Sequence, residues 1–237
     1  MLSHLIPSNY VDIHSHLLPG IDDGAPTIET SKILINELQK IGFFEFITTP
    51  HCMELVWPNT ENSIVTLLNT TKSDLNQLYC TPKLSAAAEY MMDGAFLKSI
   101  CKKQLLTLKD NYVLVEMSYI NPPLHLYDTL FELQLNGYQP VLAHPERYAF
   151  YHSNQNEYHK LKDAGCLFQL NLLSTVGYYG LDVSKRADYL LLNKMIDFVG
   201  SDVHHQKHVD AFSEKIVLKN YDTLPQLLQN NAFFGSK

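Results

Sequence analysis

Short apolar runs alternate with longer amphipathic segments along this chain. The short runs consist mostly of Val, Ile, Leu, Phe and small residues, with few polar positions between them. Such near-continuous apolar runs are typical of strands that are covered on both faces. The pattern predicts seven strands, at Val11–His16, Phe44–Thr49, Leu84–Glu89, Tyr112–Ser118, Pro140–His144, Leu167–Leu172 and Phe198–Ser201.

The longer segments carry the spacing of helices. Between Ile28 and Ile41, for example, Ile35 and Leu38 lie near the same stripe as the two terminal isoleucines. Helices are predicted at Ile28–Ile41, Thr60–Leu78, Leu124–Asn136, Val183–Asn193 and Thr223–Asn231. Alternating strands and helices form βαβ units, and seven strands suggest a closed or nearly closed α/β barrel. Because no repeat or Pro/Gly-rich linker divides the chain, a single domain over residues 1–237 is expected.

Polar side chains stand at the carboxyl ends of the apolar runs. They are His14, His16, His51, Glu89, Glu116, His144, Asp202 and His204. In a parallel α/β barrel, the carboxyl ends of all strands meet at one face, where the active site lies. The turn Asp22-Asp23-Gly24 follows the first strand closely, so Asp23 is a ninth candidate. We therefore expect these side chains to converge on one site.

The types and spacing of these side chains suit divalent metal ions. His14 and His16 are two residues apart, so both side chains leave the same face of an extended strand, and Asp202 and His204 repeat this spacing. Nitrogen and carboxylate ligands without thiolates suit Zn²⁺, Mn²⁺ or Fe²⁺. Taken alone, an H-x-H pair is often incidental and an Asp-Asp-Gly sequence is a turn. Nine candidates at one face favour a metal site.

Charge counting favours a phosphate ester as the substrate. The four carboxylates would supply about four negative charges and three divalent ions about six positive ones, which leaves about two for a phosphate monoester dianion. Arg147 lies just after the fifth predicted strand, three residues beyond His144. A guanidinium group binds phosphate oxygens in a bidentate manner, so Arg147 is a candidate for substrate binding and catalysis. The competing interpretation is a surface ion pair with Glu146 or another acid.

Composition and charge argue against several other classes. The net charge of −7 and the lack of a basic stripe argue against nucleic-acid and acidic-membrane binding. The four cysteines form no C-x-x-C pair, none has an arginine six positions later, and no G-x-S-x-G sequence occurs. The N-terminus has no signal-peptide character, and no apolar run reaches the roughly 18 residues of a membrane span. We expect a cytoplasmic protein with reduced thiols and no membrane insertion.

Five sequence blocks together resemble the polymerase-and-histidinol-phosphatase (PHP) family. They are Val11-Asp12-Ile13-His14-Ser15-His16, Gly20-Ile21-Asp22-Asp23-Gly24, Thr48-Thr49-Pro50-His51, Ala143-His144-Pro145-Glu146-Arg147 and Gly200-Ser201-Asp202-Val203-His204. The chain is most similar to the branch of bacterial manganese-dependent protein-tyrosine phosphatases of capsule and exopolysaccharide operons. The resemblance runs from about Val11 to past His204.

The resemblance implies a distorted (β/α)₇ barrel of the PHP type that holds about three divalent ions, with Mn²⁺ the first choice and Fe²⁺ or Zn²⁺ as alternatives. It assigns one ion to His14, His16, Glu89 and Asp202, a second to Glu89, Glu116 and His144, and a third to Asp23, His51 and His204. Arg147 matches the phosphate-binding arginine of the family. Family substrates are phosphotyrosines on the tyrosine-rich tail of a bacterial tyrosine kinase, and related members form homo-oligomers.

The chain departs from that family after its Asp-x-His block. The family usually carries a second arginine there, whereas this sequence reads His205-Gln206-Lys207-His208. Lys207, or else His205, is the candidate for this second substrate contact, although lysine lacks the planar fork of arginine. Two loops are also of interest. Cys52–Asn59, with Trp57, is either a lid or substrate wall or simply packing. Tyr178-Tyr179, between two glycines, is either an exposed loop that contacts a peptide or a packing loop, and packing is the preferred interpretation.

Two other functions stay open from the sequence. The same metal site could serve a small phosphomonoester such as histidinol phosphate, or a nucleic-acid 3′ end, although the acidic balance argues against the latter. The chain could also be a metal-stabilised scaffold that regulates a kinase without turnover. The presence of every expected ligand argues against the scaffold.

Overall fold

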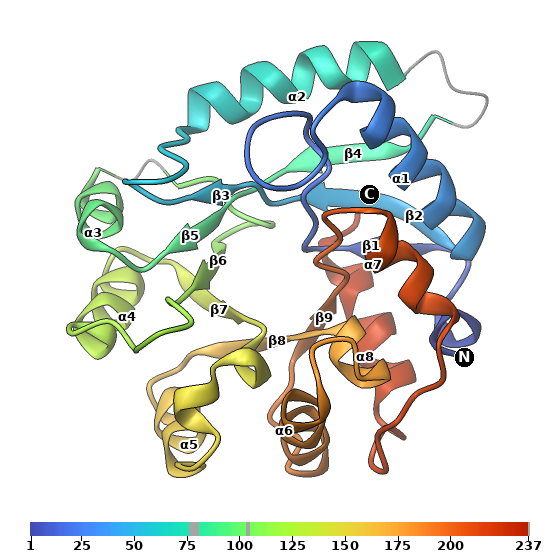
Figure 1. Ribbon diagram of the computed structural model, residues 1–237. Helices are drawn as coiled ribbons and strands as arrows, with labels where there is room; N and C mark the ends of the chain where they lie inside the picture. Colours follow the sequence, from blue (N-terminus) through green and yellow to red (C-terminus); the bar gives the residue numbers. More distant parts are fainter. Residues whose placement is uncertain (76–80, 103–104, 237) are drawn as a thin grey trace.

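The strands lie in two parallel sheets (Figure 1). The computed structural model describes residues 1–75, 81–102 and 105–236. One sheet has the order β1-β2-β4, with β1 (Tyr10–Asp12), β2 (Phe43–Thr48) and β4 (Lys83–Ala86). The other has the order β3-β5-β6-β7-β8-β9, with β3 (His51–Cys52), β5 (Glu89–Met91), β6 (Tyr112–Glu116), β7 (Gln139–Ala143), β8 (Leu167–Asn171) and β9 (Phe198–Gly200). The expected α/β class with parallel strands is therefore confirmed.

The chain passes from the first sheet to the second at two places. Thr49 and Pro50 separate β2 from β3, and the predicted strand Leu84–Glu89 is divided into β4 and β5 at Ala87 and Ala88. The prediction of one continuous strand there was wrong. Proline has no N–H to donate to a ladder, so pairing between neighbouring strands is interrupted at this point.

The first and last strands, β1 and β9, belong to different sheets, and side chains join them. Asn231 is fully buried between them and donates through Nδ2 to the carbonyls of Val11 (3.0 Å) and Val199 (2.7 Å). Farther along, the Ser201 hydroxyl donates to Asp12 at 2.6 Å. An isolated parallel bridge between Ser15 and Val203 then completes the seam.

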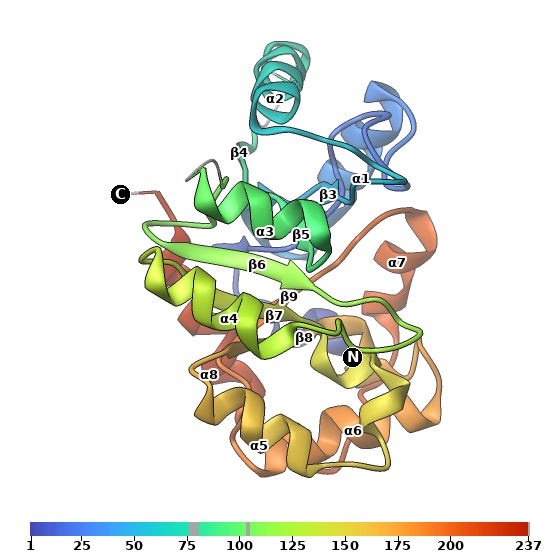
Figure 2. The same ribbon diagram turned by 90° about the vertical axis from the view of Figure 1, so that its left-hand side faces the viewer.

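The helices lie mainly on the outside of the strands (Figures 1 and 2). They are α1 (Ile28–Ile41), α2 (Glu61–Leu75), α3 (Gly94–Cys101), α4 (Leu126–Leu135), α5 (Asn156–Asp163), α6 (Leu181–Leu192), α7 (Gln206–Asp210) and α8 (Leu224–Asn230). All five predicted helices are present, and residues 76–78 of the predicted Thr60–Leu78 lie outside the described residues. The short helices α3, α5 and α7 were not predicted. In α5 only Tyr158 and Leu161 are buried, so its sequence has almost no apolar stripe.

The core has an outer and an inner part. The larger cluster of buried apolar side chains includes residues of nearly all helices and of most strands. The smaller cluster unites Val11 and Ile47 of the first sheet with Leu114 and Val141 of the second, and Phe234 near the C-terminus belongs to it. Side chains from both sheets thus share one interior. None of the described helices is long and apolar enough to cross a membrane.

Candidate metal and phosphate site

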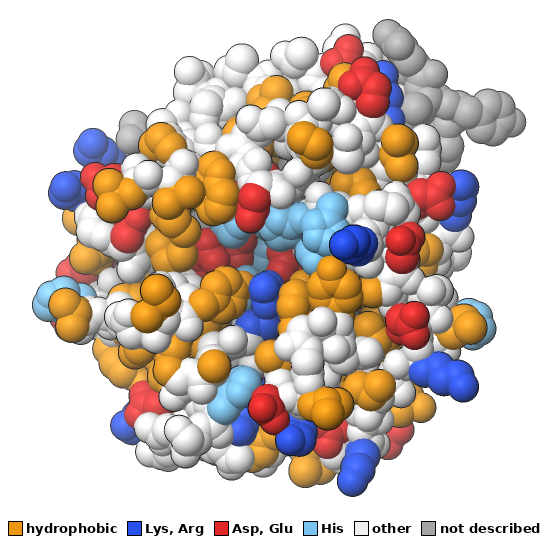
Figure 3. All heavy atoms as spheres, in the orientation of Figure 1, with side chains coloured by type: hydrophobic (Ala, Val, Ile, Leu, Met, Phe, Trp, Pro, Cys, Tyr) orange, Lys and Arg blue, Asp and Glu red, His pale blue; other side chains and the backbone are white. Residues whose placement is uncertain are grey.

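The nine predicted ligands gather at the carboxyl ends of the strands. Figure 3 shows histidine and carboxylate side chains in the hollow at the centre of this face. Seven of the nine are buried, His204 is partly buried, and the Asp23 side chain is 52% exposed, so the cluster opens toward solvent beside Asp23. The sequence rule that strand ends meet at one face therefore places all of them correctly together.

Glu89 lies at the centre of the cluster. Its Oε2 atom is 3.3 Å from His14 Nε2, 3.4 Å from His16 Nε2 and 3.1 Å from His51 Nδ1, and its Oε1 atom is 3.0 Å from His144 Nε2. One fully buried carboxylate therefore contacts four imidazoles. A group in this position can bridge neighbouring cations.

The remaining ligands surround this centre in overlapping groups whose donor atoms lie within 4.8 Å of one another. The groups are His16, Asp23, His51 and His204; His14, His144 and Asp202; His14, His16 and Glu89; and His51, Glu89 and Glu116. The resemblance to the family assigned Asp23, His51 and His204 to one ion, and these three residues do form a group in the structure, together with His16. The resemblance assigned Glu116 to the same ion as His144, whereas in the structure Glu116 is grouped with His51. The division among individual ions thus stays a prediction.

Several buried polar atoms in the cluster fit a cation better than a hydrogen bond. His51 Nδ1 lies 2.8 Å from Glu116 Oε1 and 3.1 Å from Glu89 Oε2. None of these three atoms has a hydrogen-bond partner in the described part of the protein. Buried polar atoms without partners cost free energy. A divalent ion shared by a nitrogen and two carboxylate oxygens would satisfy all three, so the residues fit a metal centre.

The charges of the cluster are strongly coupled. Burial alone would lower the pKa of His14, but Glu89 and Asp202 outweigh burial and raise it well above its usual value. Burial and the nearby Glu89 raise the pKa of Glu116 to about 7. Protons and cations therefore compete for the same atoms.

Residues outside the predicted set orient the histidines. Asp22 Oδ2 lies 2.8 Å from His16 Nδ1, and Gln169 Oε1 lies 2.7 Å from His14 Nδ1. Contacts of this kind fix the tautomer and leave the Nε2 atoms free as ligands. The sequence interpretation treated Asp22 only as part of a turn and missed Gln169. The signal for Gln169 was its polar side chain inside the apolar run Leu167–Leu172.

Two motif glycines allow close packing at the site. A Cβ atom on Gly24 would lie 2.2 Å from the carbonyl oxygen of His16, and one on Gly200 would lie 2.7 Å from both the Gln169 amide and His14 Cβ. The glycines of the Asp-Asp-Gly and Gly-Ser-Asp-Val-His blocks are thus needed for contact with the ligand strand.

The backbone is strained at two of the ligands. His144 has φ +37° and Asp202 has φ +51°, in the left-handed region that side chains other than glycine rarely adopt. Each follows a strand, and the turn directs its side chain inward. Such strain is often found where a functional side chain must be held in one place.

Arg147 lies at the rim of the cluster and contacts Asp202. Its Nη1 atom donates to Asp202 Oδ2 at 2.7 Å, and its guanidinium lies over the rings of Tyr119 and Tyr179. The competing interpretation was an ion pair with Glu146 or another acid; Arg147 pairs with Asp202, which is buried and belongs to the cluster, and not with Glu146. Glu146 is fully buried and accepts hydrogen bonds from the Ser174 hydroxyl and other groups on its far side.

The second predicted basic contact, Lys207 or else His205, concerns the substrate and stays a prediction. Lys207 lies exposed on α7, and no hydrogen bond or ion pair of the described residues joins it to the cluster. His205 is also exposed. In this segment His208 turns inward, and its Nδ1 atom accepts a hydrogen bond from the His204 amide at 3.1 Å. The substrate role of Lys207 stays a prediction without geometric support.

The loop after His51 lies beside the cluster. Trp57 stacks on the His51 ring, with ring centroids 4.8 Å apart and an angle of 14° between the planes. Leu55 at the loop's tip is 93% exposed. Trp57 thus packs directly on a candidate ligand, and a role of this loop as lid or substrate wall stays a prediction.

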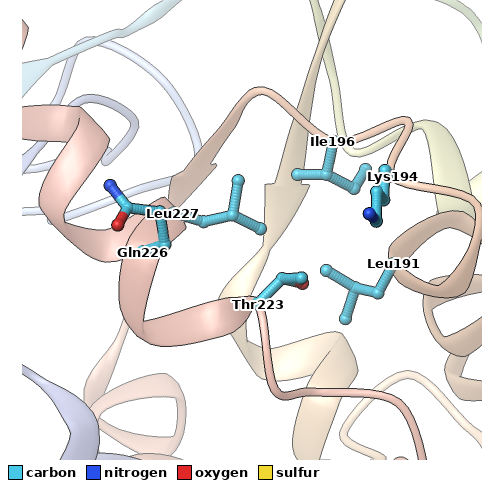
Figure 4. Close-up of a pocket in the computed structure, with 6 residues that line it drawn as sticks. All are labelled: Leu191, Lys194, Ile196, Thr223, Gln226 and Leu227. Carbon is cyan, nitrogen blue, oxygen red and sulfur yellow. The ribbon is translucent and has the colours of Figure 1, made fainter.

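A separate apolar pocket of about 200 Å³ lies between the end of α6 and α8 (Figure 4). It is lined by Leu191, Lys194, Ile196, Thr223, Gln226 and Leu227. No histidine or carboxylate lines it, so it offers no groups for metal binding.

The fold and the site together define an α/β protein with a buried histidine–carboxylate centre for divalent ions and an arginine at its rim. The chain belongs to the family described as "Capsular polysaccharide synthesis, CpsB/CapC", which matches residues 10–217. The resemblance seen in the sequence motifs is thereby confirmed.

Curated relatives match most of the chain. "Tyrosine-protein phosphatase YwqE" of Bacillus subtilis is 28% identical over 227 residues, which cover 94% of this chain and 89% of the relative. "Tyrosine-protein phosphatase CpsB" of Streptococcus pneumoniae is 29% identical over 222 residues, covering 89% of this chain and 90% of the relative.

A solved structure has the same fold. It is described as YwqE from Bacillus subtilis and CpsB from Streptococcus pneumoniae, "unique metal-dependent tyrosine phosphatases", and aligns with a TM-score of 0.83. The identity is 27%, and the match covers 94% of this chain and 93% of that one.

Proposed function

We propose that this protein is a metal-dependent protein-tyrosine phosphatase. The observation that carries the proposal is the joint placement of nine metal-ligating side chains and of Arg147, which shares the carboxylate of Asp202 with them. A centre of positive charge beside a guanidinium suits the three free oxygens of a phosphate monoester. The names of the relatives, all tyrosine-protein phosphatases, support the same activity.

In the proposed reaction, the residues of this chain bind and orient the phosphoryl group. Bound divalent ions supply the positive charge that polarises the ester and activates water. Arg147 binds phosphoryl oxygens through the part of its guanidinium that Asp202 leaves free. Trp57 stacks on His51, and Tyr119 stacks on His144. In this proposal the two rings border the site and limit the access of bulk water.

The centre holds about three ions in this proposal, with Mn²⁺ first and Fe²⁺ or Zn²⁺ as alternatives that share these ligands. Asp22 adds a fifth carboxylate to the four counted from sequence, and Arg147 adds one positive charge. Five carboxylates and one guanidinium give a net charge of about −4, the same as in the count from sequence. Three divalent ions would then leave about two positive charges for a phosphate dianion. Glu89 is the proposed bridging ligand.

The substrate is proposed to be a phosphotyrosine protein, namely the tyrosine-rich tail of a bacterial tyrosine kinase in capsule or exopolysaccharide synthesis. The described cysteines Cys52, Cys101 and Cys166 are free thiols, which suits a cytoplasmic location. A homo-oligomer is part of the proposal by analogy with the family.

The fold is proposed to be one distorted (β/α)₇ barrel in a single domain. Counting β2 with β3 and β4 with β5 as interrupted strands gives seven positions around the ring. The interior cluster that unites both sheets supports this interpretation, as does the seam of Asn231, Asp12 and Ser201 between β1 and β9.

Purified protein loaded with Mn²⁺ should be assayed on a phosphotyrosine peptide and on histidinol phosphate, with elemental analysis of the same sample. We expect turnover of the peptide and about three ions per chain. The matched variant Glu89→Gln keeps the shape but halves the acceptors of the central carboxylate, and should lose both metal and activity. Preference for histidinol phosphate would identify a small-molecule phosphatase, and full metal content without turnover of either substrate would identify a scaffold.

A further inference from the structure

The guanidinium of Arg147 lies between two aromatic rings. Its Cζ atom is 4.8 Å from the ring centre of Tyr119, in the loop after β6, and 4.1 Å from that of Tyr179, in the loop before α6. The two tyrosines come from segments about sixty residues apart; the sequence marked Tyr179 only as part of a loop that contacts a peptide or simply packs, and it did not mark Tyr119. Guanidinium groups are attracted to the faces of aromatic rings at these distances.

Both rings are themselves fixed by residues of the cluster. The Tyr119 ring stacks on His144 at 5.7 Å with an angle of 26° between the planes, and its hydroxyl lies 3.4 Å from His144 Nε2. The Tyr179 hydroxyl accepts a hydrogen bond from Asn171 Nδ2 at 3.0 Å, and the same amide donates to Asp202 Oδ2 at 2.9 Å. Each of the two tyrosine rings that contact Arg147 is therefore connected to a candidate ligand, Tyr119 to His144 and Tyr179, through Asn171, to Asp202.

These contacts leave Arg147 little freedom. Two aromatic rings lie within 5 Å of its Cζ atom, Nη1 donates to Asp202, and only 20% of the side chain is exposed. A long side chain that is held in this way loses little further entropy when it binds an oxyanion. An unclamped arginine at the same position would first have to be ordered.

We propose that Tyr119 and Tyr179 are positioning residues that hold the Arg147 guanidinium between their rings, with its free edge directed at the phosphoryl oxygens of the substrate. The inference rests on the proposed phosphatase function. It also distinguishes Tyr179 from a residue of a plain packing loop, because its ring contacts a charged group beside the ligands. Tyr119 is 46% exposed, which a ring that only fills the core would not be.

The test compares leucine with phenylalanine at both positions. Tyr119→Leu and Tyr179→Leu remove the aromatic face, whereas Tyr119→Phe and Tyr179→Phe keep it and remove the hydroxyl. Tyr127→Leu is the matched control, because Tyr127 is 40% exposed on α4 and its hydroxyl contacts Glu157 instead. Each variant is loaded with Mn²⁺ and measured for metal content, for binding of inorganic phosphate by calorimetry, and for kcat and KM on a phosphotyrosine peptide.

We expect each leucine variant to bind phosphate about 2- to 30-fold more weakly, the range that one cation–π contact corresponds to. KM should rise by a similar factor while metal content stays at the wild-type level. Tyr127→Leu should bind phosphate like the wild type, and each phenylalanine variant, which keeps the ring and loses only the hydroxyl contact, should be weakened less than the leucine variant at the same position. In an Arg147→Ala background, the leucine substitutions should have no further effect, because the group that they position is absent.

Three results would overturn the inference. They are unchanged phosphate binding in both leucine variants, loss of metal from them, or an undiminished effect in the Arg147→Ala background. Failure of the proposed function is recognised separately. A wild-type protein that does not hydrolyse the phosphotyrosine peptide refutes the phosphatase, while the phosphate-binding comparison still decides whether the two rings position Arg147.

Discussion

Replacement of Asn231 by alanine should open the seam between the first and last strands. Asn231 is fully buried, and its side-chain oxygen accepts from the Val199 amide at 3.3 Å. Its amide nitrogen donates to the carbonyls of Val11 and Val199 and to the Tyr10 hydroxyl. One side chain thus serves backbone groups of both β1 and β9, where the two strands do not share a ladder.

The magnitude follows from the groups left without partners. Alanine at this position would remove the side-chain partner of the Val199 amide and of the Val11 carbonyl, whereas the Val199 carbonyl keeps its hydrogen bond from the Tyr10 hydroxyl at 3.3 Å. A buried polar group that loses its partner costs about 1–3 kcal/mol. Water that enters the vacated space would recover part of this cost. We expect the free energy of unfolding to fall by about 2–5 kcal/mol. For a chain of this size, the loss corresponds to a decrease in Tm of about 4–20 °C.

The assay is thermal and urea unfolding of the metal-free protein, with Asn230→Ala as the control. Asn230 is the same residue type one position earlier, but it is only partly buried, and its amide donates to the Asp197 carbonyl at 3.3 Å. Its replacement should cost about 1 kcal/mol or less. If Asn231→Ala and Asn230→Ala unfold within about 2 °C of each other, the seam is not held by Asn231 and the reasoning is refuted.

The remaining predictions concern the site. Arg147→Ala should keep its metal content and its fold but lower the turnover of phosphotyrosine about 10²–10³-fold. His144→Ala should lower the metal content as well as the turnover. Wild-type kinetics for Arg147→Ala would show that the arginine is only a structural ion pair. Gly24→Ala should weaken Mn²⁺ binding, because an added Cβ would lie 2.2 Å from the His16 carbonyl, and Gly94→Ala, where nothing lies within 4 Å, is the control; equal Mn²⁺ affinities would contradict this. In the metal-free protein, burial lowers the pKa of His14 and His16, but the neighbouring carboxylates raise it by more, so the pKa of both histidines lies well above its usual value. Their stabilising effect is complete below the pKa of an unfolded histidine, about 6.5, and is lost as pH rises through the raised folded pKa. The Tm in chelator should therefore fall as pH rises above about 6.5, and a Tm that rises with pH there would refute the coupling.

The sequence was most informative where one physical rule decides the outcome. Strands covered on both faces are continuous apolar runs, and parallel strands present their carboxyl ends at one face. A histidine or carboxylate at such an end is therefore conspicuous, as His51 and Glu116 are. That rule brought eight candidate ligands together without knowledge of any contact between them, and the adjacent Asp-Asp-Gly turn added Asp23.

The seam could not be predicted, because no periodic signal marks it. Asn231 contacts Val11 across 220 residues through a single amide, and nothing in its neighbourhood distinguishes it from other asparagines. The break between β4 and β5 has no cause in its own sequence. The sequence shows a cause only in the neighbouring segment, where Pro50 separates β2 from β3. The helix α5 was missed because its burial depends on two residues.

The orienting residues of the site were missed for a different reason. Tyr119 and Tyr179 resemble core aromatics in sequence, since only the fold reveals that a guanidinium lies between them. Asp22 sits in a turn sequence that has a sufficient local explanation, so its contact with His16 remained hidden. Gln169 was detectable in principle, because a buried polar side chain within a strand requires a partner.

Asp202 links the candidate metal cluster to Arg147, the proposed substrate-binding arginine. Its Oδ1 atom faces His14 at 3.2 Å and His16 at 3.4 Å, whereas its Oδ2 atom accepts from Arg147 at 2.7 Å. The two oxygens thus serve different partners, and the left-handed backbone at this residue fixes both directions at once. A cation that draws on Oδ1 weakens the hold of the same carboxylate on Arg147. The guanidinium then depends more on its aromatic neighbours for its position and has more of its charge available for the phosphoryl group, so metal loading and phosphate binding should be coupled through this one side chain.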